Sequence, residues 1–153
     1  MARRSLGRGL LVVSGLLGPA GVLPAVAQDA PPVASSAGQL SVELNDLATS
    51  QKGCKLTFVT ENTLPQSIDK VSFEVVLFDR KGLVERMAVL DFRDLPEGKT
   101  KVRQFDLSGT RCEDVGGLLL NDSPACTGAG LSADACMKGL KAGSKVDGVS
   151  LKG

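Results

Sequence analysis

This chain of 153 residues contains no histidine, no tryptophan and no tyrosine. Without histidine it cannot use that side chain as a general base, as a metal ligand or as a pH switch near neutrality. Its few aromatic residues are all phenylalanine, and no basic patch interleaved with aromatic residues is present. We therefore expect no nucleic-acid partner.

The signatures of common catalytic and metal sites are missing as well. There is no Gly-x-Ser-x-Gly motif and no Asp-x-Asp-x-Asp calcium loop with its closing glutamate. Scattered carboxylates could bind Ca²⁺, although turns and strand ends explain them more simply. They are Asp91, Asp94, Asp106, Glu113 and Asp114. We expect no enzymatic activity, metal or other cofactor; a hydrolase without these motifs would need a deep cleft with an activated serine or a carboxyl pair.

The N-terminus has the pattern of a secretory signal peptide. Three arginines precede an apolar run over residues 9–17, and a small-x-small cleavage pattern ends at Ala27. The apolar run is too short to span a bilayer, so no membrane anchor is expected after cleavage. The pattern predicts that residues 1–27 are removed and that the mature protein is periplasmic. The arginine pair at positions 3 and 4 leaves twin-arginine and general export as alternatives.

Cleavage would leave 153 − 27 = 126 residues, enough for one domain with a hydrophobic core. The first 27 residues hold three of the 18 basic residues and none of the 17 acidic ones, so the mature net charge would be 15 − 17 = −2. Residues 28–38 are rich in proline, alanine and serine, which predicts a flexible linker before a domain over residues 39–153.

The four cysteines, an even number, predict two disulfides in an exported domain. Three pairings are possible, and we favour Cys54 with Cys112 and Cys126 with Cys136. The first pair would flank strand starts in neighbouring or facing sheets, and the second would close a short polar loop. The alternative is a thiol or metal-handling protein that uses Cys126 and Cys136, although the spacing gives neither a Cys-x-x-Cys motif nor the close pairs of a zinc site.

Residues 71–92 form the longest strand-like apolar run of the mature chain and predict a β-hairpin. Apolar residues lie at every second position from Val71 to Leu77, so one face of an extended strand carries them all. Gly82 suits the left-handed conformation that the turn between the two strands requires.

Shorter alternating segments predict further strands. We expect them over residues 40–45, 54–62, 100–107, 115–120 and 146–151, with a short helix over 133–140 that Ser132 caps. The alternation slips within residues 100–107, which predicts a bulge near Arg103 and Gln104 that returns Val102 and Phe105 to the core. The unbroken apolar run over residues 118–120 predicts a strand covered on both faces. The pattern as a whole favours an all-β fold, an antiparallel β-sandwich of six to seven strands with a short C-terminal helix and a disulfide-stapled loop.

Residues 75–79 read Val-Val-Leu-Phe-Asp and resemble the Phe-x-Leu-Tyr-Asp motif of FxLYD-type immunoglobulin-like domains of bacterial envelope proteins. Val75 stands in place of the Phe, and Phe78 in place of the Tyr. The similarity covers roughly residues 40–107 and includes Asn62 before the connection to the central hairpin. The resemblance implies an immunoglobulin-like sandwich and says little about activity.

The whole mature chain also resembles an uncharacterised family of proteobacterial exported proteins. The resemblance implies a periplasmic β domain with paired cysteines, without a substrate or a catalytic residue. The shared features are Cys54, Val76-Leu77-Phe78-Asp79, Leu95-Pro96, Gly98-Lys99-Thr100, Phe105-Asp106-Leu107, Cys112, Leu119-Leu120-Asn121-Asp122, Cys126 and Cys136.

Two groups of residues are candidates for an interaction surface. Val76 and Phe78 point away from the predicted core face, so either the C-terminal segment covers them or they form an exposed apolar patch. Lys99, Lys101 and Arg103 share one strand face, which is either simply solvated or binds an acidic partner or an anionic head group. We therefore expect a non-catalytic binding module that contacts another envelope protein. The sequence does not fix its oligomeric state.

Overall fold

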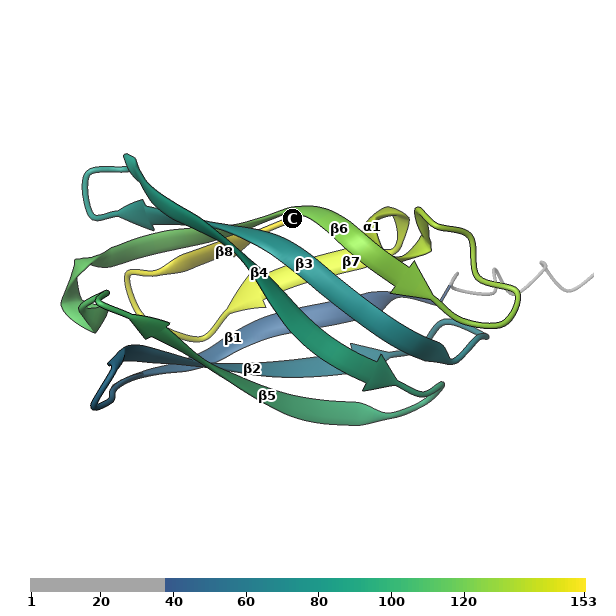
Figure 1. Ribbon diagram of the computed structural model, residues 1–153. Helices are drawn as coiled ribbons and strands as arrows, with labels where there is room; N and C mark the ends of the chain where they lie inside the picture. Colours follow the sequence, from purple (N-terminus) through teal and green to yellow (C-terminus); the bar gives the residue numbers. More distant parts are fainter. Residues whose placement is uncertain (1–37) are drawn as a thin grey trace, which may run out of the picture. The chain divides into compact units, whose positions relative to one another are not determined.

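The computed structural model describes residues 38–153, which fold into two packed β-sheets (Figure 1). The expected signal peptide and, apart from Gly38, the expected linker lie outside the described residues. Sheet A has the strand order β5-β2-β1-β7, and sheet B has the order β4-β3-β6-β8. Sheet A consists of β1 (Leu40–Thr49), β2 (Gly53–Asn62), β5 (Thr100–Ser108) and β7 (Leu140–Ser144). Sheet B consists of β3 (Ile68–Asp79), β4 (Val84–Leu95), β6 (Val115–Thr127) and β8 (Ser150–Lys152).

The all-β sandwich is confirmed, but the described residues form eight strands instead of six or seven, and not every pair is antiparallel. β7 runs parallel to β1, and β8 runs parallel to β6. The sequence pattern predicted only one strand after residue 140. The chain instead crosses from sheet A to sheet B through residues 145–149, so each sheet gains one edge strand.

The central hairpin is confirmed as β3 and β4, which pair antiparallel. The Asp79 carboxylate accepts hydrogen bonds from the backbone N–H groups of Lys81 and Leu83, at 2.8 and 2.9 Å. Gly82 has a φ of 81°, the left-handed conformation expected for it. The acidic side chain and the glycine together fix this turn at the end of the sandwich.

The core lies between the two sheets and is filled by the residues that alternate inward along each strand. Four of the five phenylalanines meet there, with edge-to-face contacts from Phe92 to Phe58 and Phe73 and a tilted contact from Phe92 to Phe105. The ring of Phe92 lies 5.3 Å from both Phe58 and Phe73 and 4.9 Å from Phe105, measured between centroids. The fifth phenylalanine, Phe78, lies outside this cluster.

The bulge predicted in β5 is wrong. β5 pairs with β2 in continuous register from Ser108 to Thr100, so strict alternation holds along the strand. Val102 therefore faces outward and is 57% exposed, whereas Arg103 lies on the same face as Phe105. The reason is that Arg103 finds backbone oxygen acceptors at the edge of the sandwich, which lets a charged residue occupy a position on the inner face.

The predicted disulfides, Cys54 with Cys112 and Cys126 with Cys136, are both present, and the described residues contain no free cysteine. Cys112 lies in a short 3₁₀ helix, η1 (Cys112–Asp114). The predicted C-terminal helix is shorter than expected: α1 covers only Ala135–Lys138, and no side chain caps it. The segment after α1 pairs with β1 as β7, which leaves no room for the helix to continue to residue 140.

Candidate functional site

The outer face of sheet A is mainly polar, and Val102 with the half-buried Val59 opposite it forms its one apolar pair. Strand alternation turns hydrophilic side chains to solvent there, and Gln104 donates a hydrogen bond to Thr57 at 3.1 Å across β5 and β2. This is the pattern of a sheet face that water covers. The outward positions include Ser41, Glu43, Lys55, Thr57, Gln104, Asp106 and Lys141.

The outer face of sheet B carries an apolar patch. In one cross-strand row Phe78 lies between Val84 and Gly117, and in the next Val76 lies between Met87 and Leu119. Met87 is 52% exposed, and Val84 and Val89 are exposed to a similar extent. We define the outer patch as Val76, Phe78, Val84, Met87, Val89 and Leu119. It extends over three strands, whereas the outer face of sheet A carries only the apolar pair Val59 and Val102.

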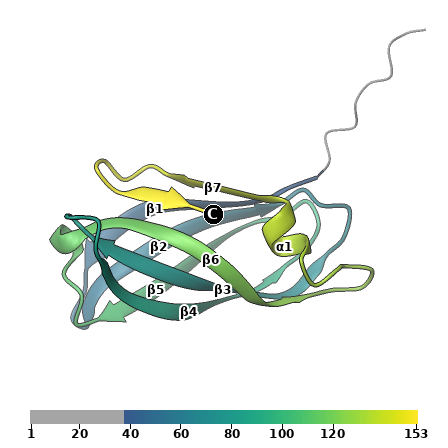
Figure 2. The same ribbon diagram turned by 90° about the horizontal axis from the view of Figure 1, so that it is seen from above.

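The C-terminal segment does not cover this patch, contrary to one of the two alternatives that the sequence left open. β8 extends sheet B beside β6, as Figure 2 shows. Val76 is only 6% exposed, because Met87 and Leu119 flank it in the same row. Phe78 is half-buried and therefore offers part of its ring at the surface. The expectation that residues 118–120 are covered on both faces is also wrong, since Leu119 is only half-buried.

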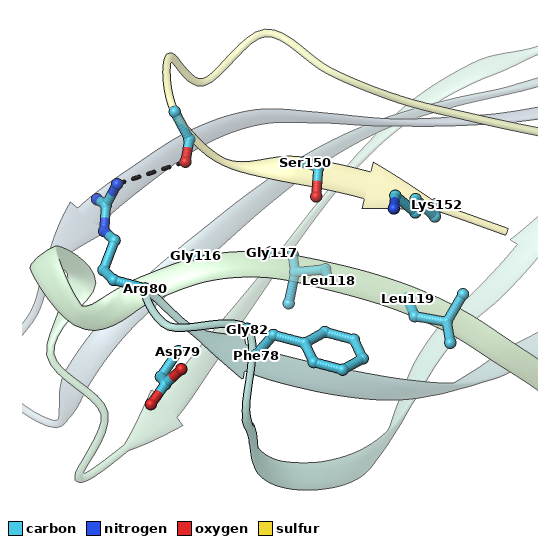
Figure 3. Close-up of a pocket in the computed structure, with 11 residues that line it drawn as sticks. Phe78, Asp79, Arg80, Gly82, Gly116, Gly117, Leu118, Leu119, Ser150 and Lys152 are labelled. Atoms are coloured by element: carbon cyan, nitrogen blue, oxygen red, sulfur yellow. Dashed lines mark hydrogen bonds between the residues drawn. The ribbon is translucent and has the colours of Figure 1, made fainter.

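A groove of about 610 Å³ opens in the outer face of sheet B beside Phe78. Figure 3 shows the Phe78 ring on one side, Leu119 toward one end, and Ser150 and Lys152 of β8 on the opposite side. The hairpin turn and the segment before β8 close the other end, where Arg80 points toward Gly148. The groove is thus formed by three strands of one sheet and by two turns.

The groove depends on Gly117, the second of two glycines that follow Val115 at the start of β6. Gly117 lies opposite Ser150 on one side and Phe78 on the other, and it contributes no side chain to the floor. A Cβ at this position would come 2.8 Å from the Ser150 hydroxyl oxygen. Gly116 has a different role, because a Cβ there would collide with the backbone of Asp79.

Two cationic side chains line the groove. The Arg80 Nε donates to the carbonyl oxygen of Glu113 at 2.9 Å, and its Nη1 donates to the carbonyl oxygen of Gly148 at 3.4 Å. Lys152 is exposed on β8. Neither cation forms an ion pair with a carboxylate of residues 38–153. The Asp79 carboxylate, which also lines the groove, is held by the two N–H groups of its own turn.

The predicted basic stripe is not part of this groove. Lys101 and Arg103 lie at the flank of the sandwich, where they join the edge strands β5 and β4. Lys101 forms an ion pair of 2.7 Å with Asp94, and Arg103 Nε donates to the carbonyl oxygen of Phe92 at 2.6 Å. The hydrogen bond from Lys101 lowers the pKa of Asp94 below its usual value, helped by the charges of Lys101 and Arg103. These two residues hold the sheets together, and Lys99 lies outside the pair in the turn before β5.

The remaining candidates for chemistry are not brought together. The carboxylates of Glu113 and Asp114 pair with Arg111, and Asp91 accepts a hydrogen bond from the backbone of Arg93. Within residues 38–153, no group of three or more acidic or cysteine side chains is placed to hold a metal ion. None of the four cysteines lines the groove.

Sequence reasoning found Val76 and Phe78 but missed the rest of the groove. Arg80 and Lys152 are 72 positions apart in the sequence and line the same groove only because β8 pairs in parallel with β6. The usable signal was the pair Gly116-Gly117 at the start of an apolar run, because glycine weakens a strand unless space is needed there.

Within the part of the chain that the structure describes, no helix has the length and apolar character needed to cross a membrane. Comparison of the chain with known protein families, with curated proteins and with solved structures found no match.

Proposed function

We propose that this protein is a non-catalytic interaction module of the bacterial cell envelope and that the outer patch of sheet B binds another envelope protein. The observation that carries the proposal is the contrast between the two outer faces: sheet A presents polar side chains apart from the single pair Val59 and Val102, whereas sheet B presents Val84, Met87 and Val89 at more than half exposure beside Phe78 and Leu119. A contiguous exposed apolar patch of this kind favours a partner contact.

Periplasmic location belongs to the same proposal. The N-terminal signal pattern supports it, and so do two disulfides that use all four cysteines, since such bonds form and persist in oxidising compartments. The immunoglobulin-like class and the resemblance to FxLYD-type domains are also part of the proposal, and the packing of two four-stranded sheets supports them. No specific observation favours the thiol or metal-handling alternative, because Cys126 and Cys136 are bonded to each other.

Site-specific photo-crosslinking in living cells tests the partner contact. A photoreactive amino acid replaces Met87 on the outer patch, and a matched control replaces Gln104 on the outer face of sheet A. Both sites lie on edge strands and face outward. We expect a discrete crosslinked adduct from position 87 and none from position 104. Equal yields at the two sites, or no adduct at position 87, would contradict the proposal.

Intact mass of the periplasmic fraction tests export. We expect loss of about the first 27 residues, no thiol labelling before reduction, and four labels after reduction. Recovery of the full-length chain in the cytoplasm, with thiols that react without reduction, would overturn the periplasmic location.

A further inference from the structure

We infer that the groove beside Phe78 receives an acidic segment of a partner protein that inserts one large apolar side chain between Phe78 and Leu119. This inference rests on the proposed function and names the chemistry of the partner. It is drawn from the shape of the groove, its apolar lining and the cations on its rim.

The apolar part of the groove suits a side chain rather than a flat surface. Phe78 is the single phenylalanine outside the core cluster, and its half-buried ring is recessed between the rows of β4 and β6. Gly117 leaves the floor open, and Leu119 stands beside it. A volume of about 610 Å³ falls within the range of pockets that bury organic ligands. A protruding side chain can therefore reach the Phe78 ring and exclude water from it.

The two cations of the rim favour an acidic segment, because the one carboxylate of the groove lining, Asp79, is held by two N–H groups of its own turn. The guanidinium group of Arg80 has five N–H donors, and the two hydrogen bonds to backbone carbonyls leave donors for a ligand. Lys152 extends from β8 at the other end of the groove, without an ion-pair partner in residues 38–153. The two cations thus flank the apolar floor, and carboxylates on both sides of an inserted apolar residue would complement them.

A bilayer surface fits the same lining less well. Its acyl chains would have to enter a recess whose ring is only half-exposed, while the exposed apolar side chains of β4 lie outside the recess.

The chain has no tryptophan and no tyrosine, so the fluorescence of a tryptophan-containing peptide can be measured without a contribution from the protein. The probe is a blocked pentapeptide with a central tryptophan and two glutamates on each side. We expect its emission to shift to the blue when the purified protein is added, because the indole leaves water. A second peptide, with lysines in place of the glutamates, should bind at least tenfold more weakly, and added salt should weaken the acidic peptide.

Three variants locate the binding in the groove. Gly117→Val fills the floor with a residue that strands favour, and it should abolish the shift while the far-UV circular dichroism stays unchanged. Lys152→Glu should weaken binding at least fivefold. The matched control Lys141→Glu, on the outer face of sheet A, should leave binding unchanged.

Several outcomes would overturn the inference. They are equal binding of the acidic and basic peptides, binding that survives Gly117→Val, and sedimentation with phosphatidylglycerol vesicles that depends on Lys152 while the peptide fails to bind. If no peptide binds but crosslinking at position 87 persists, the groove inference fails and the proposed function stands. If both are negative, both fail.

Discussion

Gly116 and Gly117 are adjacent in β6 but serve different purposes, and this difference can be measured. A Cβ on Gly116 would collide with the backbone of Asp79 and would lie 2.9 Å from the Cα of Arg80. Neither backbone segment can move aside cheaply. We expect Gly116→Ala to lower the free energy of unfolding by about 1–3 kcal/mol, the usual range for overpacking. Gly117→Ala meets only the rotatable Ser150 hydroxyl and should change stability by less than about 0.5 kcal/mol. Urea unfolding followed by circular dichroism tests the pair, and equal losses would contradict this account.

Asn62 is the best example of a polar residue that the fold needs. It is fully buried, and its amide group donates to the carbonyl oxygens of Gln66 and Leu95, both at 2.9 Å. Its side-chain oxygen accepts from the N–H of Leu64 at 3.0 Å, so the residue satisfies three backbone groups at the start of the β2–β3 connection. The resemblance to FxLYD-type domains included Asn62, but the sequence pattern alone gave it no role.

We expect Asn62→Ala to lower the free energy of unfolding by about 2–3 kcal/mol, because it leaves buried carbonyl oxygens without donors. The control is Asn121→Ala on the outer face of sheet B, where the exposed amide bonds only to the half-buried Glu74. That change should cost less than about 0.5 kcal/mol. Urea titrations of the three proteins provide the comparison, and a loss at Asn121 as large as that at Asn62 would refute the assignment.

At the scale of elements, alternation predicted the long strands well. β2, β3 and the hairpin turn follow from side chains of period two and from Asp79 with Gly82, because one buried face imposes that period. The prediction of a bulge in β5 is wrong because it places the charged Arg103 toward solvent. The Arg103 side chain instead lies on the inner face, is 18% exposed and donates to the carbonyl oxygen of Phe92. β7 was missed since its sequence, Leu-Lys-Ala-Gly-Ser, has almost no strand signal of its own and is held by pairing with β1. The groove could not be predicted either. It depends on where β8 pairs, and that pairing is not visible in the sequence of the strand itself.

The stability that the flank between β4 and β5 contributes should decrease at acidic pH. The pKa of Asp94 is lowered by the hydrogen bond from Lys101, so folding favours its charged form. The stabilisation it supplies is therefore present above the ordinary pKa of an aspartate, near 4, and is lost as the pH falls through the lowered value. Because the carboxylate is half-exposed, we expect a modest effect that salt reduces.

The test compares thermal unfolding of Asp94→Asn with that of the unmodified protein between pH 7 and pH 2. The unmodified protein should melt higher at pH 7, and the gap should close as the pH falls below about 4. Asp106→Asn, on the outer face of sheet A and without an ion pair in residues 38–153, is the control and should show no such closing gap. A gap for Asp94→Asn that is constant with pH would rule out the ion pair as its origin.

At the scale of the whole molecule, two disulfides that close loops of different length hold the sandwich together. The bond between Cys54 and Cys112 links residues 58 positions apart and ties the start of β2 to η1, whereas Cys126 and Cys136 are only 10 positions apart and tie the end of β6 to α1. If disulfides act mainly by restricting the unfolded chain, the longer loop must contribute more. The loop entropy predicts about 4 kcal/mol for the first bond and about 3 kcal/mol for the second.

Replacing each pair by alanine separates these contributions. We expect Cys54→Ala with Cys112→Ala to lower the free energy of unfolding by about 4 kcal/mol or more, because Cys54 is also fully buried and its truncation leaves a small void. Cys126→Ala with Cys136→Ala should cost about 3 kcal/mol and should leave the tryptophan-peptide titration unchanged, because neither residue lines the groove. Urea unfolding of both double variants gives the two losses, and each is a large share of the 5–15 kcal/mol typical of a domain. A larger loss from the shorter loop would show that packing around α1, and not the restriction of the unfolded chain, sets the value of these bonds.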